Sequence, residues 1–171
     1  RTLMIKRFIL SLILWFWLAT GLPVQAQETP ALAEVNVNFW PEFDQPSMLV
    51  IYHITLAPSV SLPAEFVLRI PAAAKPNAVA VRQPDDSLLN ASYTSEVEGD
   101  WLYLTIQAST PVLQVEYYDP SLSRDGAQRR FVYEWPGDYA VASFKIEVQQ
   151  PIGATNMHFS PSLGAGEQAP N

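Results

Sequence analysis

The chain has 171 residues, with 10 Lys and Arg against 17 Asp and Glu, a formal net charge of −7 and no cysteine. A surface of this sign repels the phosphates of nucleic acids and anionic lipid headgroups, so the composition argues against nucleic-acid binding. The absence of cysteine excludes disulfides, thiolate ligands for zinc, thiol catalysis and a lipoprotein anchor.

The first 26 residues carry the pattern of a secretory signal peptide. Lys6 and Arg7 precede a charge-free apolar run from Phe8 to Leu22, and Val24 to Ala26 places small residues where a signal peptidase cleaves. We therefore expect an exported protein, extracellular or on the cell surface, or periplasmic in a host with two membranes. If the signal is not cleaved, it would act as a membrane anchor, although the apolar run is short for a bilayer span.

The remaining sequence is long enough for one domain with a sizeable core. Residues 27–33 are expected to form a flexible leader, and residues 34–160 a single β-sandwich domain. Residues 161–171 are rich in small residues and are expected to form a flexible tail, or a linker to further sequence.

Apolar and polar side chains alternate in most of the segments between residues 34 and 160, which is typical of strands with one buried face. In chain order, these segments are 35–39, 66–70, 102–106, 131–135 and 142–148. Residues 48–56 are apolar on both faces, as expected for a central strand. The core is predicted to contain Val35, Val37, Phe39, Val50, Tyr52, Phe66, Leu68, Leu102, Leu104, Val115, Phe131, Tyr133, Phe144 and Ile146.

Prolines lie mainly at the boundaries of these segments, where a missing N–H does not interrupt a hydrogen-bond ladder. No stretch has the period of an amphipathic helix. The sequence therefore predicts an all-β fold, an antiparallel immunoglobulin-like or jelly-roll-like β-sandwich that follows the signal peptide.

The sequence offers little for catalysis. His53 lies in an apolar segment and His158 in an expected last strand, and no G-x-S-x-G motif accompanies them. Acids in expected loops and turns could bind calcium or act as a hydrolytic pair, but no calcium-loop pattern is present. These acids are Asp85, Asp86, Glu96, Glu98, Asp100, Asp119 and Asp125. We expect no catalytic residue, no cofactor and no bound metal.

Four aromatic residues fall on the polar side of their strands, namely Trp40, Trp101, Tyr103 and Tyr118. Flat rings on a rigid sheet can stack on sugar rings or fill a pocket of a partner. The alternative is that a loop or another domain covers them, which would make them ordinary packing residues.

Several motifs carry a resemblance to a known group of proteins. They are Trp40-Pro41-Glu42, Pro46-Ser47, Tyr117-Tyr118-Asp119-Pro120, the segment from Arg129 to Tyr139, and Val148-Gln149-Gln150-Pro151. Over residues 34–160 the chain resembles uncharacterised bacterial exported proteins with a β-sandwich ectodomain. The resemblance implies the fold and a place at the cell envelope, often with a membrane anchor further downstream. Its motifs are strand and turn residues, so it transfers no site residue.

These observations favour a non-enzymatic exported β-sandwich that serves in binding, in adhesion or as an ectodomain spacer at a bacterial envelope. Its partner would be a protein or a glycan. Contact with a membrane is expected only through an uncleaved signal or a downstream anchor. One alternative is a carbohydrate-binding module that uses the outward-facing aromatics, and another is a small hydrolase that uses the loop carboxylates.

Overall fold

The computed structural model describes residues 31–163, and this range is all-β, with no helix. The predicted signal peptide and most of the predicted tail lie outside the described residues. The strands are β1 (Leu32–Pro41), β2 (Met48–Leu56), β3 (Ala64–Pro71), β4 (Lys75–Arg82), β5 (Leu88–Asn90), β6 (Tyr93–Glu98), β7 (Trp101–Ala108), β8 (Val112–Asp119), β9 (Ser123–Asp125), β10 (Gln128–Arg130) and β11 (Val141–Val148).

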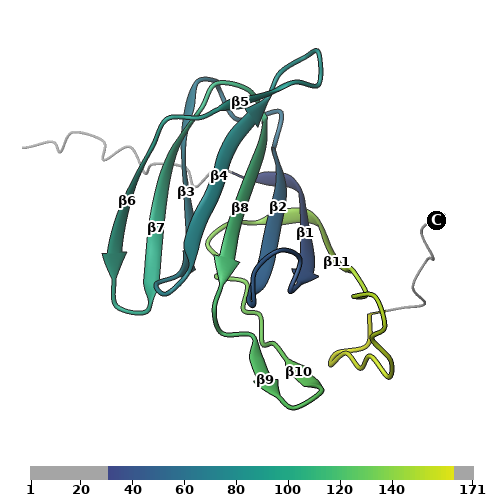
Figure 1. The fold of residues 1–171 in the computed structure, drawn as a ribbon. Coiled ribbons are helices and arrows are strands. Elements are labelled where there is room, and N and C mark those ends of the chain that lie inside the picture. Colours follow the sequence, from purple (N-terminus) through teal and green to yellow (C-terminus); the bar gives the residue numbers. More distant parts are fainter. Residues whose placement is uncertain (1–30, 164–171) are drawn as a thin grey trace, which may run out of the picture.

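The strands form two main sheets and a small hairpin. The larger sheet has six strands in the order β11-β1-β2-β8-β4-β5, and the smaller has three in the order β3-β7-β6 (Figure 1). The hairpin β9–β10 projects below the larger sheet in this view. Neighbouring strands are antiparallel except β1 and β11, which are parallel. The prediction of an all-β fold with antiparallel sheets is thus confirmed, with one parallel pair at the edge of the larger sheet.

The core lies between the inner faces of the two sheets, where alternate residues of each strand are buried. Most of the predicted core is confirmed, because ten of its residues are at most 9% exposed: Val35, Val37, Phe39, Val50, Tyr52, Phe66, Leu68, Leu102, Leu104 and Val115. β2 is central, as expected, since Leu49 and Ile51 on its outer face are also buried. Alternation therefore located the buried face of each central strand correctly.

The prediction differs from the structure near the end of the chain. Residues 131–135 are not in a strand, although Phe131 and Tyr133 pack against the core as expected. Phe144 lies on the inner face of β11, as predicted, but its side chain is 38% exposed, because β11 is an edge strand that the smaller sheet does not cover. His158 is exposed and belongs to no strand. At the other end, β1 already begins at Leu32, inside the predicted leader.

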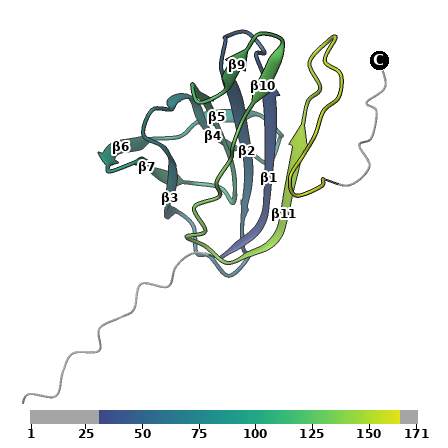
Figure 2. The ribbon, with the colours of Figure 1, turned by 90° about the horizontal axis from the view of Figure 1, so that it is seen from below.

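The segment from Phe131 to Ala140 (the closing segment) fills one open side of the sandwich. It runs from β10 to β11 along the side between β3 and β1, as Figure 2 shows. The rings of Phe131 and Tyr133 lie 5.6 and 4.8 Å from that of Phe39, between ring centroids. The Trp135 ring lies 5.9 Å from that of Tyr52. These contacts cover the part of the larger sheet's inner face that three strands cannot cover.

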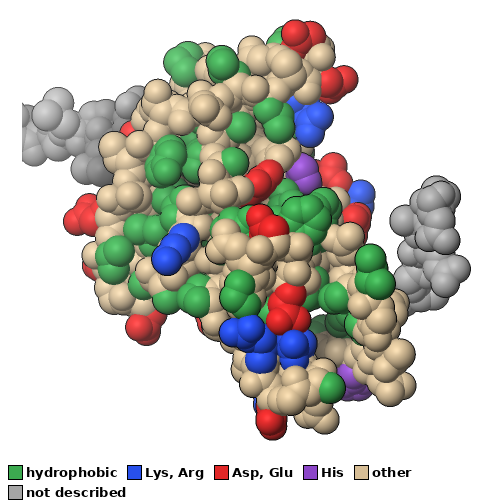
Figure 3. All heavy atoms as spheres, viewed as in Figure 1, with side chains coloured by type: hydrophobic (Ala, Val, Ile, Leu, Met, Phe, Trp, Pro, Cys, Tyr) green, Lys and Arg blue, Asp and Glu red, His purple; other side chains and the backbone are tan. Residues whose placement is uncertain are grey.

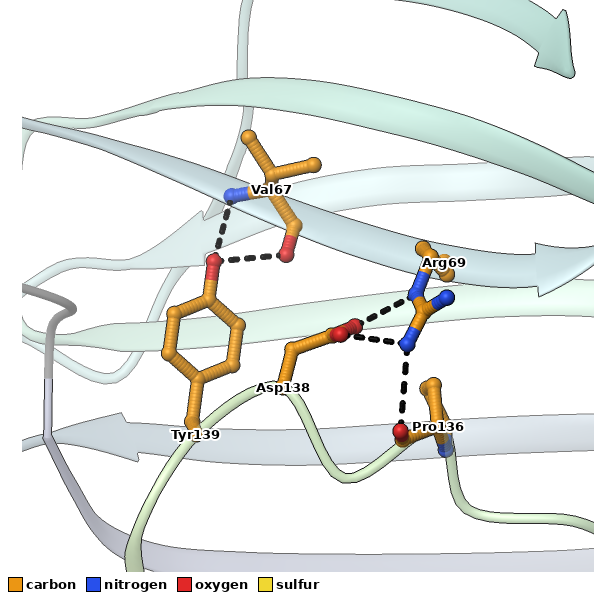
Figure 4. Close-up of polar contacts among 5 residues, drawn as sticks. All are labelled: Val67, Arg69, Pro136, Asp138 and Tyr139. Carbon is orange, nitrogen blue, oxygen red and sulfur yellow. Dashed lines mark hydrogen bonds and ion pairs between the residues drawn. The ribbon is translucent and has the colours of Figure 1, made fainter.

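Hydroxyl groups tie the closing segment to both sheets. The hydroxyls of Tyr52 and Tyr133 are 2.7 Å apart, and burial raises the pKa of both, so both stay protonated. The Tyr139 hydroxyl donates to the carbonyl oxygen of Val67 at 2.8 Å and accepts from its N–H at 3.1 Å (Figure 4). Val67 lies on β3, the edge strand of the smaller sheet, so this one hydroxyl satisfies two edge groups that no neighbouring strand reaches.

We expect Tyr139→Phe to lower the free energy of unfolding by about 1–2 kcal/mol, because it removes both hydrogen bonds to Val67 and keeps the ring that stacks on Phe66. Chemical denaturation measures the change. The control Tyr93→Phe removes a hydroxyl from a residue that is 43% exposed and should change stability by less than about 0.5 kcal/mol. Equal effects of the two substitutions would show that the Tyr139 hydroxyl does not hold the closing segment.

Candidate functional site

The four aromatic residues considered either for ligand binding or for packing do not share one surface. Trp40 and Tyr118 lie on the outer face of the six-stranded sheet, since their neighbours Phe39 and Tyr117 face the core. Trp101 and Tyr103 lie on the outer face of the three-stranded sheet, because Leu102 and Leu104 face the core. The two pairs are therefore on opposite sides of the sandwich and cannot form a single site.

On the three-stranded sheet, Arg69 covers the aromatic pair. Its guanidinium carbon lies 5.1 Å from the ring centroid of Trp101 and 6.0 Å from that of Tyr103. The guanidinium forms an ion pair with Asp138 and donates to the carbonyl oxygen of Pro136 at 3.1 Å (Figure 4). The closing segment therefore fixes Arg69 over the rings, and both rings are half-buried. Here the packing interpretation fits better than ligand binding.

On the six-stranded sheet, the loop from Glu42 to Ser47 folds back over Trp40 and Tyr118. The Phe43 ring packs on Trp40 with 4.9 Å between centroids, and the Tyr118 hydroxyl donates to Asp44 at 2.9 Å. Leu49 lies between Trp40 and Tyr118 in the sheet register and is 4% exposed. Trp40 and Tyr118 thus support this loop rather than present free rings.

The ring that the loop exposes is Phe43, at 57%. Phe43 was not among the predicted ligand-binding residues, because it lies in a loop and the alternation of side chains along a strand makes no prediction for loops. The sequence nonetheless contained an indication, since Phe43 is the one large apolar side chain in the short polar stretch between Glu42 and Ser47.

The loop is held in place from three directions. Glu42 accepts a hydrogen bond from Arg129 at 2.7 Å and lies 4.0 Å from Arg124, so both strands of the β9–β10 hairpin contact it. The backbone N–H of Glu42 donates to Ser47 across the loop at 3.0 Å. Burial, together with the hydrogen bond to Asp44, raises the pKa of Tyr118, so its hydroxyl remains a donor at neutral pH. Phe43 is therefore presented on an anchored loop.

Beyond this loop the outer face of the six-stranded sheet becomes polar. Glu116 accepts from Gln114 at 2.8 Å and from Asn77 at 3.1 Å, so two side-chain amides fix its carboxylate. Nearby in the register, Asn36 donates to Glu147 at 3.2 Å, and its buried Oδ1 has no partner among the described residues. In the view of Figure 3, acidic, histidine and apolar side chains are interspersed over this sheet, and Lys and Arg side chains gather over the β9–β10 hairpin.

His53 is half-buried on the same outer face, paired in register with Asn36 and Gln114. Burial and the nearby Arg82 cation lower its pKa, so the imidazole is neutral at pH 7. A neutral imidazole among amides and carboxylates can donate and accept hydrogen bonds.

The acids considered for calcium or hydrolysis are dispersed. Asp85 accepts from Ser87 and Asp119 from the Ser121 N–H, as turn residues do, while Glu96 and Glu98 lie on β6. Within residues 31–163, no three acidic or histidine side chains gather closely enough to hold a metal ion. In the same range no helix is long and apolar enough to cross a bilayer.

Comparisons with known proteins add little. No protein-family model and no curated protein matches the sequence. Among solved structures, native yeast LTA4 hydrolase aligns with 12% identity and a TM-score of 0.37, over 54% of this chain and 15% of the hydrolase. A likeness of that size carries no argument about activity.

We expect Trp101→Ala to lower the free energy of unfolding by about 1–2 kcal/mol, because a half-buried ring and its contact with Arg69 are lost. Chemical denaturation measures the loss, with Thr105→Ala on the same outer face as the milder control. If Trp101→Ala kept full stability but abolished binding of a ligand, the binding surface would instead be the three-stranded sheet.

Proposed function

We propose that the protein is a non-enzymatic binding domain, exported to the envelope of a bacterium, that binds a carbohydrate on the outer face of the six-stranded sheet. The observation that carries this proposal is the exposed ring of Phe43, anchored on Trp40 beside a polar sheet surface. Aromatic faces stack on the C–H faces of sugar rings, and pre-positioned side chains lose little conformational entropy when a ligand binds.

The polar part of this face supports a carbohydrate as the ligand. Sugar hydroxyls require both donors and acceptors, and the face offers the carboxylate of Glu116 as an acceptor and the neutral His53 as a donor or acceptor. The net charge of −7 disfavours strongly anionic ligands and fits neutral glycans. The sequence pattern of a signal peptide supports export, which would bring the domain to envelope polysaccharides.

We expect Phe43→Ala to weaken glycan binding about tenfold or more, while stability changes by less than about 0.5 kcal/mol because the ring is mostly exposed. A panel of neutral polysaccharides, screened by affinity electrophoresis or on a glycan array, measures the binding. The control Val132→Ala removes another exposed apolar side chain, 71% exposed, and should bind as the wild type does. Equal binding by Phe43→Ala and the wild type, or no binding to any glycan of the panel, would contradict the proposal.

A further inference from the structure

The two open sides of the sandwich are closed very differently. On the side of β3, the closing segment covers the gap, and Tyr139 occupies the edge of that strand. On the opposite side, the outermost strands are β6 of the three-stranded sheet and β5 of the six-stranded sheet. Every residue of β5 and of β6 is exposed, and in Figure 1 β6 forms the outer edge of the molecule.

In the described range, no strand lies beside the outer edge of β6. Glu98 and Trp101 close the two-residue turn between β6 and β7, and the Gln107 N–H donates to the Ser92 carbonyl at 2.9 Å. Because antiparallel pairing alternates, the intervening residues Tyr93, Ser95 and Val97 direct their N–H and C=O groups away from β7. These groups form a row to which an additional strand can bind.

Apolar side chains line this edge. Tyr93 and Val97 have the parity of the inner face, since they pair in register with the buried Ile106 and Leu102, yet they are 43% and 61% exposed. Leu89 of β5 pairs with the buried Val81 and is 58% exposed. On this side, apolar residues on the inner face of each sheet therefore remain exposed, because they lie beyond the part of that face that the other sheet covers.

The charged side chains of β6 and of its turn to β7 are all acidic, and Arg69, across Tyr103 on the same outer face, is already paired with Asp138. Glu96 and Glu98 alternate with the apolar residues of β6, and Asp100 follows in the turn. From Gln83 to Ser123 the sequence contains no lysine or arginine. An extended segment that pairs here would therefore be favoured by basic side chains on its outward face.

A second copy of the chain is a poor occupant of this edge. Two β6 strands paired with each other would bring Glu96 and Glu98 of both copies onto one continuous sheet face, where like charges repel. The closing segment shows what kind of chain fits the gap between the sheets. It is extended and inserts an aromatic side chain at every second position, through Phe131, Tyr133 and Trp135.

We infer that the edge of β6, together with Leu89, binds an extended segment of another protein by strand addition. That segment alternates apolar side chains, which insert beside Tyr93 and Val97, with Lys or Arg side chains, which lie beside Glu96 and Glu98. This interaction uses a different part of the domain from the outer face around Phe43, so it does not depend on carbohydrate binding.

The test uses the purified full chain and a synthetic peptide of alternating Val and Lys, with a peptide of alternating Val and Glu as the charge control. Ser95→Pro removes an N–H that points away from β7, so the β6–β7 ladder is retained while the added strand loses a main-chain hydrogen bond. We expect fluorescence anisotropy to show binding of the basic peptide alone. We also expect Ser95→Pro to weaken that binding about tenfold or more, while Ser95→Ala binds as the wild type does.

A second pair of measurements keeps the inference testable if Ser95→Pro disturbs the fold. Glu96→Gln combined with Glu98→Gln should weaken binding of the basic peptide and reduce its dependence on salt. On addition of the peptide, the amides of Tyr93, Ser95 and Val97 should become protected from hydrogen exchange. Equal binding of both peptides, an unchanged affinity of the double glutamine variant, or dimerisation of the chain through β6 would overturn the inference.

Discussion

The rest of the structure depends on the closure of one side of the sandwich by the closing segment, which the Tyr139 hydroxyl ties to the backbone of Val67. A six-stranded sheet presents a wider apolar face than a three-stranded sheet can cover, so part of the core around Phe39 and Tyr52 needs another cover. The closing segment provides that cover although it forms no ladder of backbone hydrogen bonds with a neighbouring strand. Its position is set by side chains: the bond of Tyr139 to β3 and the ion pair of Asp138 with Arg69.

This closure also separates the two surfaces of the domain that carry aromatic residues. Because Asp138 holds Arg69 against Trp101 and Tyr103, the outer face of the smaller sheet is occupied from within the chain. Within residues 31–163, the outer face of the larger sheet is covered in part by the loop of Phe43. The proposed ligand surface and the proposed strand-binding edge are thus regions that the described part of the chain leaves uncovered.

Much of the fold could be predicted from the sequence because burial in a sheet has a period of two residues. Alternation identified the inward residues of β1, β3 and β7, and the two-sided apolar pattern identified β2 as central. It failed for residues 131–135, where the alternation of Phe131, Tyr133 and Trp135 is real but no neighbouring strand supplies a ladder. Whether an alternating segment joins a sheet depends on partners far away in the chain, which a local pattern does not contain.

The candidate site was less predictable for the same reason. The alternation of side chains along a strand predicts that Trp40 and Trp101 face away from the core, but it does not predict which sheet each strand joins. In the structure the two residues lie on opposite sides of the sandwich. Phe43 was not predicted because side chains in a loop do not alternate between two faces as they do in a strand. Pairing between distant strands, rather than composition, decided which aromatic residues could act together.

Hydrogen exchange of single backbone amides tests the central claim most directly. Val67 and Ser95 lie on the two edge strands of the same sheet, and the N–H of each points away from its neighbouring strand. If the closing segment is held as described, the Val67 amide exchanges slowly, at a rate similar to that of buried amides in β7, while the Ser95 amide exchanges rapidly. Rapid exchange of Val67, at the rate of Ser95, would contradict the account.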